Sequence, residues 1–421
     1  MKIAIFGGGT VFHVRPHLAL AAPAYGRTAK EIQRICWNQK KWLNKRDDVE
    51  LYLTKMAHAS SAMETNEHVE KVVDHMLLDP EVKVVFFSVA MCDFTGSIYE
   101  PSEFGEPGDF STTKSGKTEQ RLRSKLEYTM ELIPSEKVIH KIRKERKDIF
   151  LVGFKTTTGA SKDEMFEAGL ALLKRASCNL VLVNDLHTRL NMIVTPEQSK
   201  YAVSDNRDKT LTELVTMTAA RSQLTFTRSK VVEGDLIQWN DERFIPNSLR
   251  TVVDHCVAEG AYKPFLGKTV GHFAVKQSKK DIITSIRKTN FNELDKTGMV
   301  WIESSDKNNV VAHGAKPSVG GMSQRIIFNK FPNLDCIVHF HCQQKPGSTV
   351  PVRSKKEFEC GSHECGQNTA DGLKEFENGI YAVMLDKHGP NIVFNKKTDP
   401  NQVIQFIEKN FDLKHQTSEL D

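Results

Sequence analysis

Short apolar runs alternate with helix-like segments along the first 225 residues of the chain. Residues 82–89 (VKVVFFSV) are almost continuously apolar, as expected of a strand that is covered on both faces. Ser161-Lys162-Asp163-Glu164 is a capping box in front of an amphipathic run at 165–175. This alternation is typical of an α/β fold with a parallel sheet. The other predicted elements are strands at 2–6, 49–54, 126–132, 149–154 and 180–183, a helix at 28–44, a helix that opens at Pro134-Ser135, and a long loop at 96–117.

The strongest boundary signal lies near residues 228–247, where periodicity is lost before a new helical pattern starts at Leu249. A chain of 421 residues is also too long for one ordinary domain. We therefore predict a first domain at 1–228, a linker at 229–246 and a second α/β domain at 247–421. In the second domain the pattern predicts strands at 270–275, 299–303, 336–342 and 381–385, and a terminal helix at 401–410.

The composition, 39% hydrophobic and 26% charged, is that of a globular protein. The net charge of +5 is small and its basic residues are dispersed, so no nucleic-acid surface is indicated. No segment reaches the roughly 18 apolar residues that a bilayer span needs, and no signal-peptide layout is present. Eight mostly isolated cysteines indicate reduced thiols. We therefore expect a cytoplasmic protein that binds neither nucleic acid nor membrane.

The candidate chemistry centres on His339 and His341, which are separated by one residue inside an apolar run. Side chains alternate along a strand, so both imidazoles are expected to point the same way. A third histidine, His388, follows another apolar run. Three neutral imidazoles with an open fourth position form a catalytic zinc site. The alternative is that these are partly buried histidines bonded to the backbone. A second metal site at Cys360, His363 and Cys365 competes with an ordinary loop and helix start.

A glycine cluster, Gly7-Gly8-Gly9-Thr10, directly follows the first predicted strand. Glycines at this position allow a phosphate to approach the backbone, and the amides of the turn can bind it. The third glycine of the dinucleotide fingerprint is absent at the required spacing. A tight turn without ligand is therefore the competing interpretation.

Several segments taken together resemble the phosphopantothenate–cysteine ligase family over nearly all of residues 1–225. They are Gly7-Gly8-Gly9-Thr10 with Val14-Arg15, and then the segments 89–94, 151–157 and 179–185. The resemblance implies a Rossmann-like nucleotide-binding domain of coenzyme A biosynthesis that forms an amide through an acyl-nucleotide, with CTP or ATP and magnesium. It places Gly8, Gly9 and Thr10 at phosphate, and Phe154, Lys155, Asn184 and Asp185 at the nucleotide site.

Two features qualify the ligase resemblance. Lys117, with Arg121, Arg123 and Lys125, could neutralise triphosphate charge, although a solvated strand edge also accounts for this basic run. Lys117 and, at the nucleotide site, Lys155 are the candidate catalytic residues. Ala22 stands where the family carries an asparagine beside the acyl-phosphate, and alanine cannot donate that hydrogen bond. A changed substrate and a lost activity are both consistent with this replacement.

Residues 248–410 resemble the class II aldolase/adducin family, which has an α/β/α fold. The resemblance rests on four segments, 271–275, Lys316-Pro317-Ser318, 337–341 and Lys387-His388-Gly389. It implies that His339, His341 and His388 bind zinc, and that the metal polarises a carbonyl to stabilise an enediolate. The sequence departs from the family at Gly320, where its enzymes carry an acid/base glutamate, and at His272, which replaces an asparagine. Glu303, Asp306 and Glu364 are candidate substitutes for that glutamate.

The leading hypothesis is a fusion of a nucleotide-dependent ligase-like domain with a zinc-dependent aldolase-like domain. Its substrates would be small phosphorylated metabolites, and we expect a homo-oligomer. The alternative is a non-catalytic protein that keeps nucleotide and metal sites for assembly or sensing, which Ala22 and Gly320 favour. A third possibility retains activity only in the metal domain.

Overall fold

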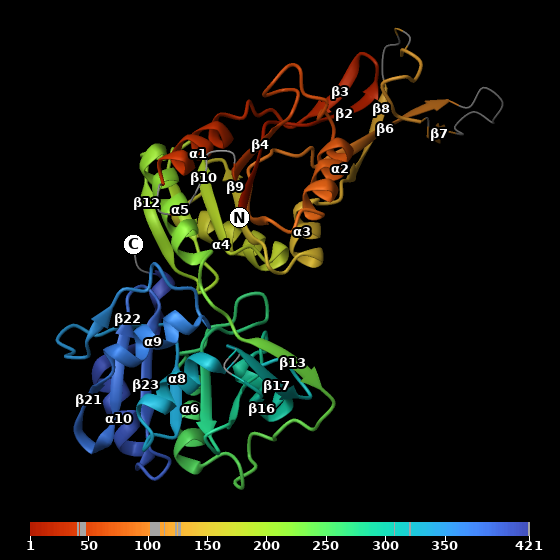
Figure 1. Ribbon diagram of the computed structural model, residues 1–421. Coiled ribbons are helices and arrows are strands. Elements are labelled where there is room, and N and C mark those ends of the chain that lie inside the picture. Colours follow the sequence, from red (N-terminus) through yellow and green to blue (C-terminus); the bar gives the residue numbers. More distant parts are fainter. Residues whose placement is uncertain are drawn as a thin grey trace. The chain divides into compact units, whose positions relative to one another are not determined.

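The structure is a computed structural model that describes residues 1–39, 42, 48–101, 110–112, 114–122, 124, 128–306, 308–319 and 321–419. It contains two compact units, which we describe one at a time (Figure 1). Unit 1 consists of Met1–Thr195 and Ala202–Ser222, and unit 2 consists of Pro196–Tyr201 and Gln223–Asp421. Both units have the predicted α/β class.

Unit 1 is built on a seven-stranded sheet. Its strands are β1 (Lys2–Gly7), β4 (Val49–Leu53), β5 (Val82–Phe87), β9 (Phe150–Thr157), β10 (Leu180–Asp185), β11 (Asn191–Val194) and β12 (Lys200–Ser204). The spatial order is β12-β11-β10-β9-β5-β1-β4, in which the five consecutive strands from β10 to the β4 edge are parallel and β11 joins antiparallel to β10. The strand order reverses between β1 and β5. In doubly wound sheets, ligands bind at the carboxyl ends of the strands at such a point.

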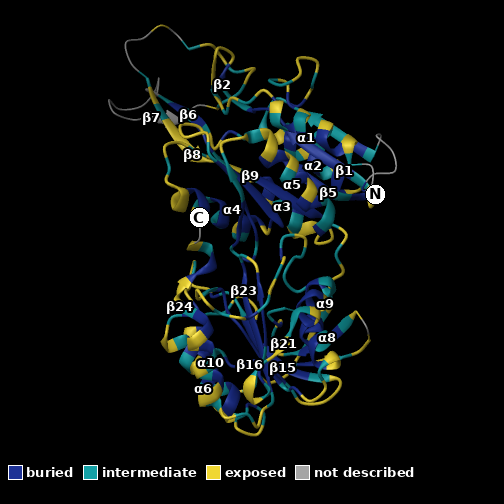
Figure 2. Cartoon of the chain, turned by 90° about the vertical axis from the view of Figure 1, so that its left-hand side faces the viewer, coloured by how far each residue is buried: buried dark blue, intermediate teal, exposed yellow. Residues whose placement is uncertain are grey.

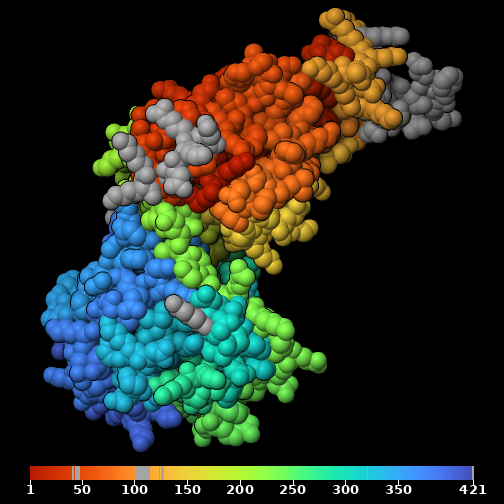
Figure 3. Space-filling view, viewed as in Figure 1, coloured from red at the N-terminus to blue at the C-terminus, as the bar shows by residue number. Residues whose placement is uncertain are grey.

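Within its described residues, the helices of unit 1 are α1 (Arg27–Asn38), α2 (Asn66–Leu77), α3 (Ile139–Glu145), α4 (Lys162–Ala176) and α5 (Arg207–Arg221). Helix α1 packs against α5, whereas α3 contacts both α2 and α4. The predicted capping box is confirmed, because Ser161 accepts a hydrogen bond from Glu164 N and the Glu164 side chain accepts one from Ser161 N. Figure 2 shows the buried central strands beside helices with exposed outer faces. In the space-filling view of Figure 3, the orange segment that contains α2 is exposed on the surface of unit 1.

Two small sheets in unit 1 differ from the sequence prediction. They are the hairpin β2 (Val11–Arg15) with β3 (Leu18–Ala21), and the antiparallel β6 (Phe94–Pro101), β7 (Phe110–Thr112) and β8 (Thr129–Pro134). The loop prediction at 96–117 was therefore wrong for its described strand residues, and 102–109 and 113 lie outside the description. Burial of Ile98 and packing at Gly96 against Val14 and Leu20 override the loop-like composition. The helix predicted at Pro134 starts later, at Ile139.

Unit 2 is built on a ten-stranded, mainly antiparallel sheet. Its strands are β13 (Arg228–Val232), β14 (His272–Lys276), β15 (Asp281–Ser285), β16 (Met299–Ser304), β17 (Asn309–His313), β18 (Cys336–His339), β20 (Val352–Arg353), β21 (Lys374–Glu375), β22 (Tyr381–Leu385) and β23 (Gly389–Phe394). The order is β13-β17-β16-β15-β14-β18-β23-β22-β20, with β21 paired to β22. A separate pair joins β19 (Cys342–Gln344) to β24 (Phe411–Gln416).

Helices cover the two faces of this sheet. They are α6 (Asn247–Ala258), the short α7 (Leu294–Thr297), α8 (Met322–Lys330), α9 (His363–Gly372) and α10 (Pro400–Asn410). One core cluster contains Leu249 of α6 and Ile407 of α10, whereas the other contains Phe328 of α8 and Ala370 of α9. Alternating strand residues supply both clusters, so unit 2 is a three-layer α/β/α structure.

The segment 229–246, predicted as a linker, contributes structure to unit 2. Strand β13 pairs in parallel with β17, and Trp239 and Ile245 lie in the core cluster with α6. An edge strand without hydrophobic alternation explains why the sequence pattern missed it. The strand predicted at 336–342 is also divided, because β18 ends at His339 and Cys342 begins β19 in another sheet.

Unit 2 also includes Pro196–Tyr201, a segment that follows β11 in the sequence and contains the first two residues of β12. Its Glu197 accepts a 2.9 Å hydrogen bond from Lys355 Nζ, and the two side chains are 1% and 0% exposed. Lys355 also donates to the carbonyl of Phe358, and Glu197 accepts from Cys360 N at 3.2 Å. A buried charge that loses its partner cannot be compensated by water. Removal of either side chain of this pair should therefore strongly lower the free energy of unfolding.

We expect Glu197→Gln to lower the free energy of unfolding by about 3–5 kcal/mol, because Lys355 would keep its charge without a carboxylate. The matched control is Glu242→Gln, which removes a 2.9 Å ion pair with Arg250 whose carboxylate is 78% exposed. Exposed pairs contribute about 0–1 kcal/mol. Chemical denaturation of the full chain measures both variants. Equal effects for the two substitutions would contradict the assigned role of Glu197.

Candidate functional site

Three buried histidines of unit 2 meet at the end of strand β18. His339 is the last residue of β18, His341 follows two residues later, and His388 immediately precedes β23. They are 1%, 4% and 1% exposed. One ligand atom from each lies within 4.8 Å of the others. The ring centroids are 5.0 Å apart for His339 and His341, 4.6 Å for His339 and His388, and 4.2 Å for His341 and His388. The predicted ligand set is therefore brought together.

Glycines allow the backbones around this cluster to approach closely. Gly389 has φ +151°, and a Cβ there would lie 2.0 Å from the carbonyl oxygen of Phe340. Gly271 has φ +110°, and a Cβ there would lie 2.5 Å from the carbonyl oxygen of His339. Neither position can hold a side chain without moving the backbone that carries the histidines. The glycines next to His272 and His388 are thus required because a side chain at either position would overlap the neighbouring backbone.

The hydrogen bonds of the cluster prepare it to bind a cation. His339 Nδ1 lies 2.6 Å from the carbonyl oxygen of Pro390, so Nδ1 carries the proton and Nε2 keeps its lone pair. Among the described residues, neither His339 Nε2 nor His388 Nδ1 has a hydrogen-bond partner. Burial lowers the pKa of His339 to about 4 and holds the pKa of His388 well below its ordinary value. Neutral imidazoles with available lone pairs are the form that binds zinc.

No carboxylate belongs to this three-histidine group in the described part of the chain. The predicted substitutes have other roles. Asp306 accepts hydrogen bonds from Asn308 N and Asn309 N, and Glu364 accepts from Thr225 N. Glu303 lies opposite Asp281 in the β15–β16 pair. Gly320 lies outside the described residues. The described residues therefore place no acid/base carboxylate in the three-histidine group.

Two further side chains, His272 and Cys360, lie beside the histidines. His272, 6% exposed, has its ring centroid 4.9 Å from that of His339, and the Gln324 amide lies 3.0 Å from its Nδ1. Cys360 Sγ lies 3.7 Å from His388 Nε2. The alternative cluster of Cys360, His363 and Cys365 does not form a second metal-ligand group within the described ranges. The His363 ring instead contacts Thr227 Oγ1 at 3.1 Å.

In unit 1 the predicted nucleotide residues lie at the carboxyl ends of neighbouring strands. The register pairs Phe154 with Leu182 and Asn184 with Thr156, which brings Phe154, Lys155, Asn184 and Asp185 to one edge of the sheet. Lys155 is exposed. Asp185 is 2% exposed and accepts hydrogen bonds from Thr188 N at 2.8 Å and Ala160 N at 3.1 Å. These bonds hold the pKa of Asp185 well below its ordinary value and tie the carboxylate to loop structure.

The glycine turn after β1 meets the segment after β5, as shown by the bridge between Gly9 and Ala90. Thr10 is fully buried, and its hydroxyl donates to Asn66 Oδ1 at 2.6 Å and accepts from Cys92 N at 2.8 Å. Gly8 and Gly9 are buried too, and a Cβ on Gly9 would lie 2.1 Å from the carbonyl oxygen of Ala22. The turn is therefore shaped by close backbone packing, and the Thr10 hydroxyl is engaged within the protein.

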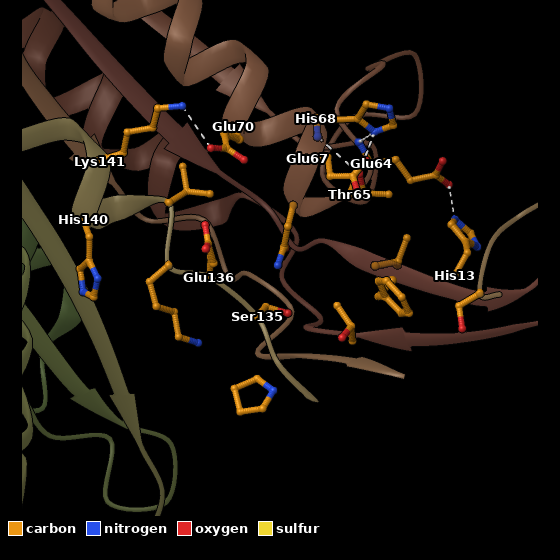
Figure 4. Close-up of a pocket in the computed structure, with 18 of the residues that line it drawn as sticks. His13, Glu64, Thr65, Glu67, His68, Glu70, Ser135, Glu136, His140 and Lys141 are labelled. Carbon is orange, nitrogen blue, oxygen red and sulfur yellow. Dashed lines mark hydrogen bonds and ion pairs between the residues drawn. The ribbon is translucent and has the colours of Figure 1, made fainter. Parts of the chain in front are cut away.

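Lys117 lies in a different part of unit 1, in a cavity of about 1180 Å³ between β2, α2 and the start of α3. Its Nζ is 3.0 Å from Glu64 Oε2, and Glu64 also lies 3.5 Å from His13 Nε2 (Figure 4). The hydrogen bond from Lys117 is the main cause that lowers the pKa of Glu64. Lys155 does not line this cavity. Arg121 is exposed, and Arg123 and Lys125 lie outside the described residues. Sequence reasoning missed Glu64 and His13, which carry no motif.

No family model matches this chain, and comparison with curated sequences finds a partial match. The coenzyme A biosynthesis bifunctional protein CoaBC of Thermococcus kodakarensis is 27% identical over 124 residues, or 30% of this chain and 26% of that protein. The chain thus matches about a quarter of that relative's length. Similar solved structures include the DNA/pantothenate metabolism flavoprotein from Streptococcus pneumoniae, with 15% identity, a TM-score of 0.39 and coverage of 51% of this chain and 96% of that one. They also include L-fuculose 1-phosphate aldolase, with 17% identity, a TM-score of 0.29 and coverage of 38% and 82%.

The names of these proteins belong to the two groups that the sequence resembles. Pantothenate-metabolism proteins and aldolases are both present among the similar chains. No helix in the described residues is long and apolar enough to cross a membrane. None of the eight cysteines, all of which are described, forms a disulfide.

We predict that the metal-stripped protein loses stability as the pH falls below about 6.5. The folded state keeps His272, His339 and His388 neutral because burial lowers their pKa values, whereas the unfolded chain binds protons at ordinary histidine pKa values. The unfolded state then holds more protons, so each such histidine removes about 1.4 kcal/mol of stability per pH unit down to its folded pKa.

Denaturation of the full chain with a chelator, from about pH 7 to about pH 5, measures this slope. His272→Gln should reduce the dependence of the free energy of unfolding on pH by about 1.4 kcal/mol per pH unit, the contribution of one histidine. The control is His415→Gln, since that side chain is 60% exposed. A stability that does not change over this range would contradict the prediction.

Proposed function

We propose that unit 2 binds zinc or a similar divalent metal ion through His339, His341 and His388 and acts as a metal-dependent lyase of the class II aldolase type. The observation that carries this proposal is the convergence of three buried imidazoles whose ligand atoms lie within 4.8 Å of one another. A bound metal ion would polarise a substrate carbonyl and stabilise negative charge on its oxygen. The substrate class is small phosphorylated metabolites, as the sequence resemblance of residues 248–410 implies.

This chain's own residues would prepare the site before any substrate binds. The Pro390 carbonyl fixes the ring orientation and tautomer of His339 through the 2.6 Å contact. Thr417 Oγ1 donates to the carbonyl of His388 at 2.9 Å, and Thr417 N donates to the carbonyl of His341 at 2.9 Å. Both loops that carry the ligands are thereby tied to the same residue, which limits the reorganisation needed on binding.

For unit 1 we propose a nucleotide-dependent, ligase-like activity related to coenzyme A biosynthesis. Its support is the motif resemblance of residues 1–225, the 27% identity with CoaBC over 124 residues, and a doubly wound sheet. The nucleotide, CTP or ATP with magnesium, would bind at the carboxyl ends of β9 and β10 beside Lys155 and Asn184. Lys155 is the candidate to contact phosphate, since it is exposed at this edge.

The second candidate function is a non-catalytic protein that uses nucleotide and metal sites for assembly or sensing. Two observations favour it: Ala22 in place of a hydrogen-bond donor, and the lack of a carboxylate in the described metal group. For either function we propose a cytoplasmic homo-oligomer that acts on small molecules.

We expect purified protein to carry about one zinc or similar ion per chain, because three imidazoles are the usual protein ligands of a catalytic zinc. His339→Ala/His341→Ala should lose the ion, whereas His415→Ala, on an exposed side chain, should retain it. Metal analysis after gentle purification and reconstitution measures the content. Absence of metal in the reconstituted wild type would reject the lyase. Bound metal without metal-dependent cleavage of any phosphorylated hydroxycarbonyl compound would select the non-catalytic function.

We expect CTP or ATP with magnesium to raise the melting temperature of unit 1. At 100 times Kd, a ligand adds about 2.7 kcal/mol of stability. Lys155→Ala should weaken binding about tenfold, which corresponds to about 1.4 kcal/mol. Lys147→Ala, on an exposed lysine before the other end of β9, is the matched control. If no nucleotide at millimolar concentration shifts the transition, the site is rejected.

A further inference from the structure

The three-histidine group leaves one coordination position of a four-coordinate zinc without a protein ligand. The acid/base glutamate expected by resemblance near the metal is replaced in the sequence by Gly320, and the described residues place no carboxylate in the three-histidine group. His339 Nε2, on a residue that is 1% exposed, lacks a hydrogen-bond partner among the described residues. A ligand-poor buried site of this kind can be completed by any soft donor that lies beside it.

The Cys360 thiol is such a donor. Its Sγ lies 3.7 Å from His388 Nε2. When one tetrahedral zinc binds a nitrogen at about 2.1 Å and a sulfur at about 2.3 Å, the two ligand atoms are about 3.6 Å apart. The thiol approaches from the His388 side and is not part of the group defined by the 4.8 Å limit. A shared coordination sphere would require the Cys360 side chain to turn towards His339 and His341.

The backbone on both sides of this contact is held by the same short segment, Pro196–Tyr201. Glu197 accepts a hydrogen bond from Cys360 N at 3.2 Å and is itself paired with Lys355. Ser199 Oγ donates to the carbonyl of Lys387, the residue before His388. On the other side of Cys360, Ser362 caps helix α9 by accepting from Cys365 N at 3.0 Å. The sulfur and the imidazole are therefore presented to one another by fixed backbone.

We propose that Cys360 supplies a fourth protein ligand to the metal ion of unit 2, as a thiolate whose proton passes to solvent on binding. This inference rests on the proposed metal site. A Cys-His₃ sphere would have no permanently open position, so substrate would have to displace the thiolate or expand the coordination. Glu197 would act as a positioning residue for Cys360, without touching the metal.

The experiment replaces the native metal of the full-length chain with Co²⁺ and records the visible and near-ultraviolet spectrum. Visible ligand-field bands report that cobalt is bound, and a near-ultraviolet sulfur-to-cobalt charge-transfer band reports a thiolate ligand. We expect both in the wild type. Cys360→Ser should lose the charge-transfer band and bind cobalt about 10- to 100-fold more weakly, while it keeps ligand-field bands from the histidines. Cys365→Ser, a nearby buried thiol on α9, is the control that should keep both.

Each other outcome has a defined meaning. Ligand-field bands without a charge-transfer band in the wild type, or a charge-transfer band that persists in Cys360→Ser, would overturn the Cys360 proposal and leave the metal site standing. No cobalt binding at all would overturn both. If Cys360→Ser does not fold, alkylation of the wild type decides. Peptide mass spectrometry should find Cys360 protected by zinc and modified after chelation, and equal modification in both states would overturn the proposal.

Discussion

Three imidazoles confined in one nearly water-free space are the constraint on which unit 2 depends. Burial lowers the pKa values of His339 and His388, and the 2.6 Å contact with Pro390 leaves a lone pair on His339 Nε2. Imidazole lone pairs that face one another repel, and a buried site offers them few hydrogen-bond donors. One divalent cation could instead accept several of these lone pairs at once. The end of β18, the backbone approaches at Gly271 and Gly389, and the anchoring by Thr417 all serve to create this arrangement. The three-histidine cluster is thus a consequence of how tightly three backbone segments converge.

The same convergence shows what the sequence could predict. Alternation along a strand identified His339 and His341 as a pair, and they do meet, although β18 ends at His339 and His341 belongs to the connection that follows. The pairing of His388 with them could not be derived from spacing, because it depends on a turn in which Lys387 adopts φ 54° and Gly389 lies against Phe340. Resemblance supplied that third ligand. The contribution of Glu197 was missed, because 158 residues separate it from Lys355.

Unit 1 illustrates a different limit. Its buried parallel strands could be predicted because a continuous apolar run fits a strand covered on both faces better than it fits a surface helix or a loop. The roles of polar residues at the strand ends could not. A hydroxyl or carboxylate at such a position can face a ligand or bind the neighbouring backbone, and the structure uses Thr10 and Asp185 in the second way. Composition also failed where tertiary packing decides, as in β6, where Ile98 is buried within a segment that resembles a loop.

The segment Pro196–Tyr201 has a consequence for how the two halves could have been joined. Because it is encoded between β11 and the end of β12 yet folds with unit 2, the boundary between the units is crossed more than once by the chain. A gene cut near residue 223 would produce a second half in which Lys355 is buried without Glu197. The two halves are therefore not exchangeable modules.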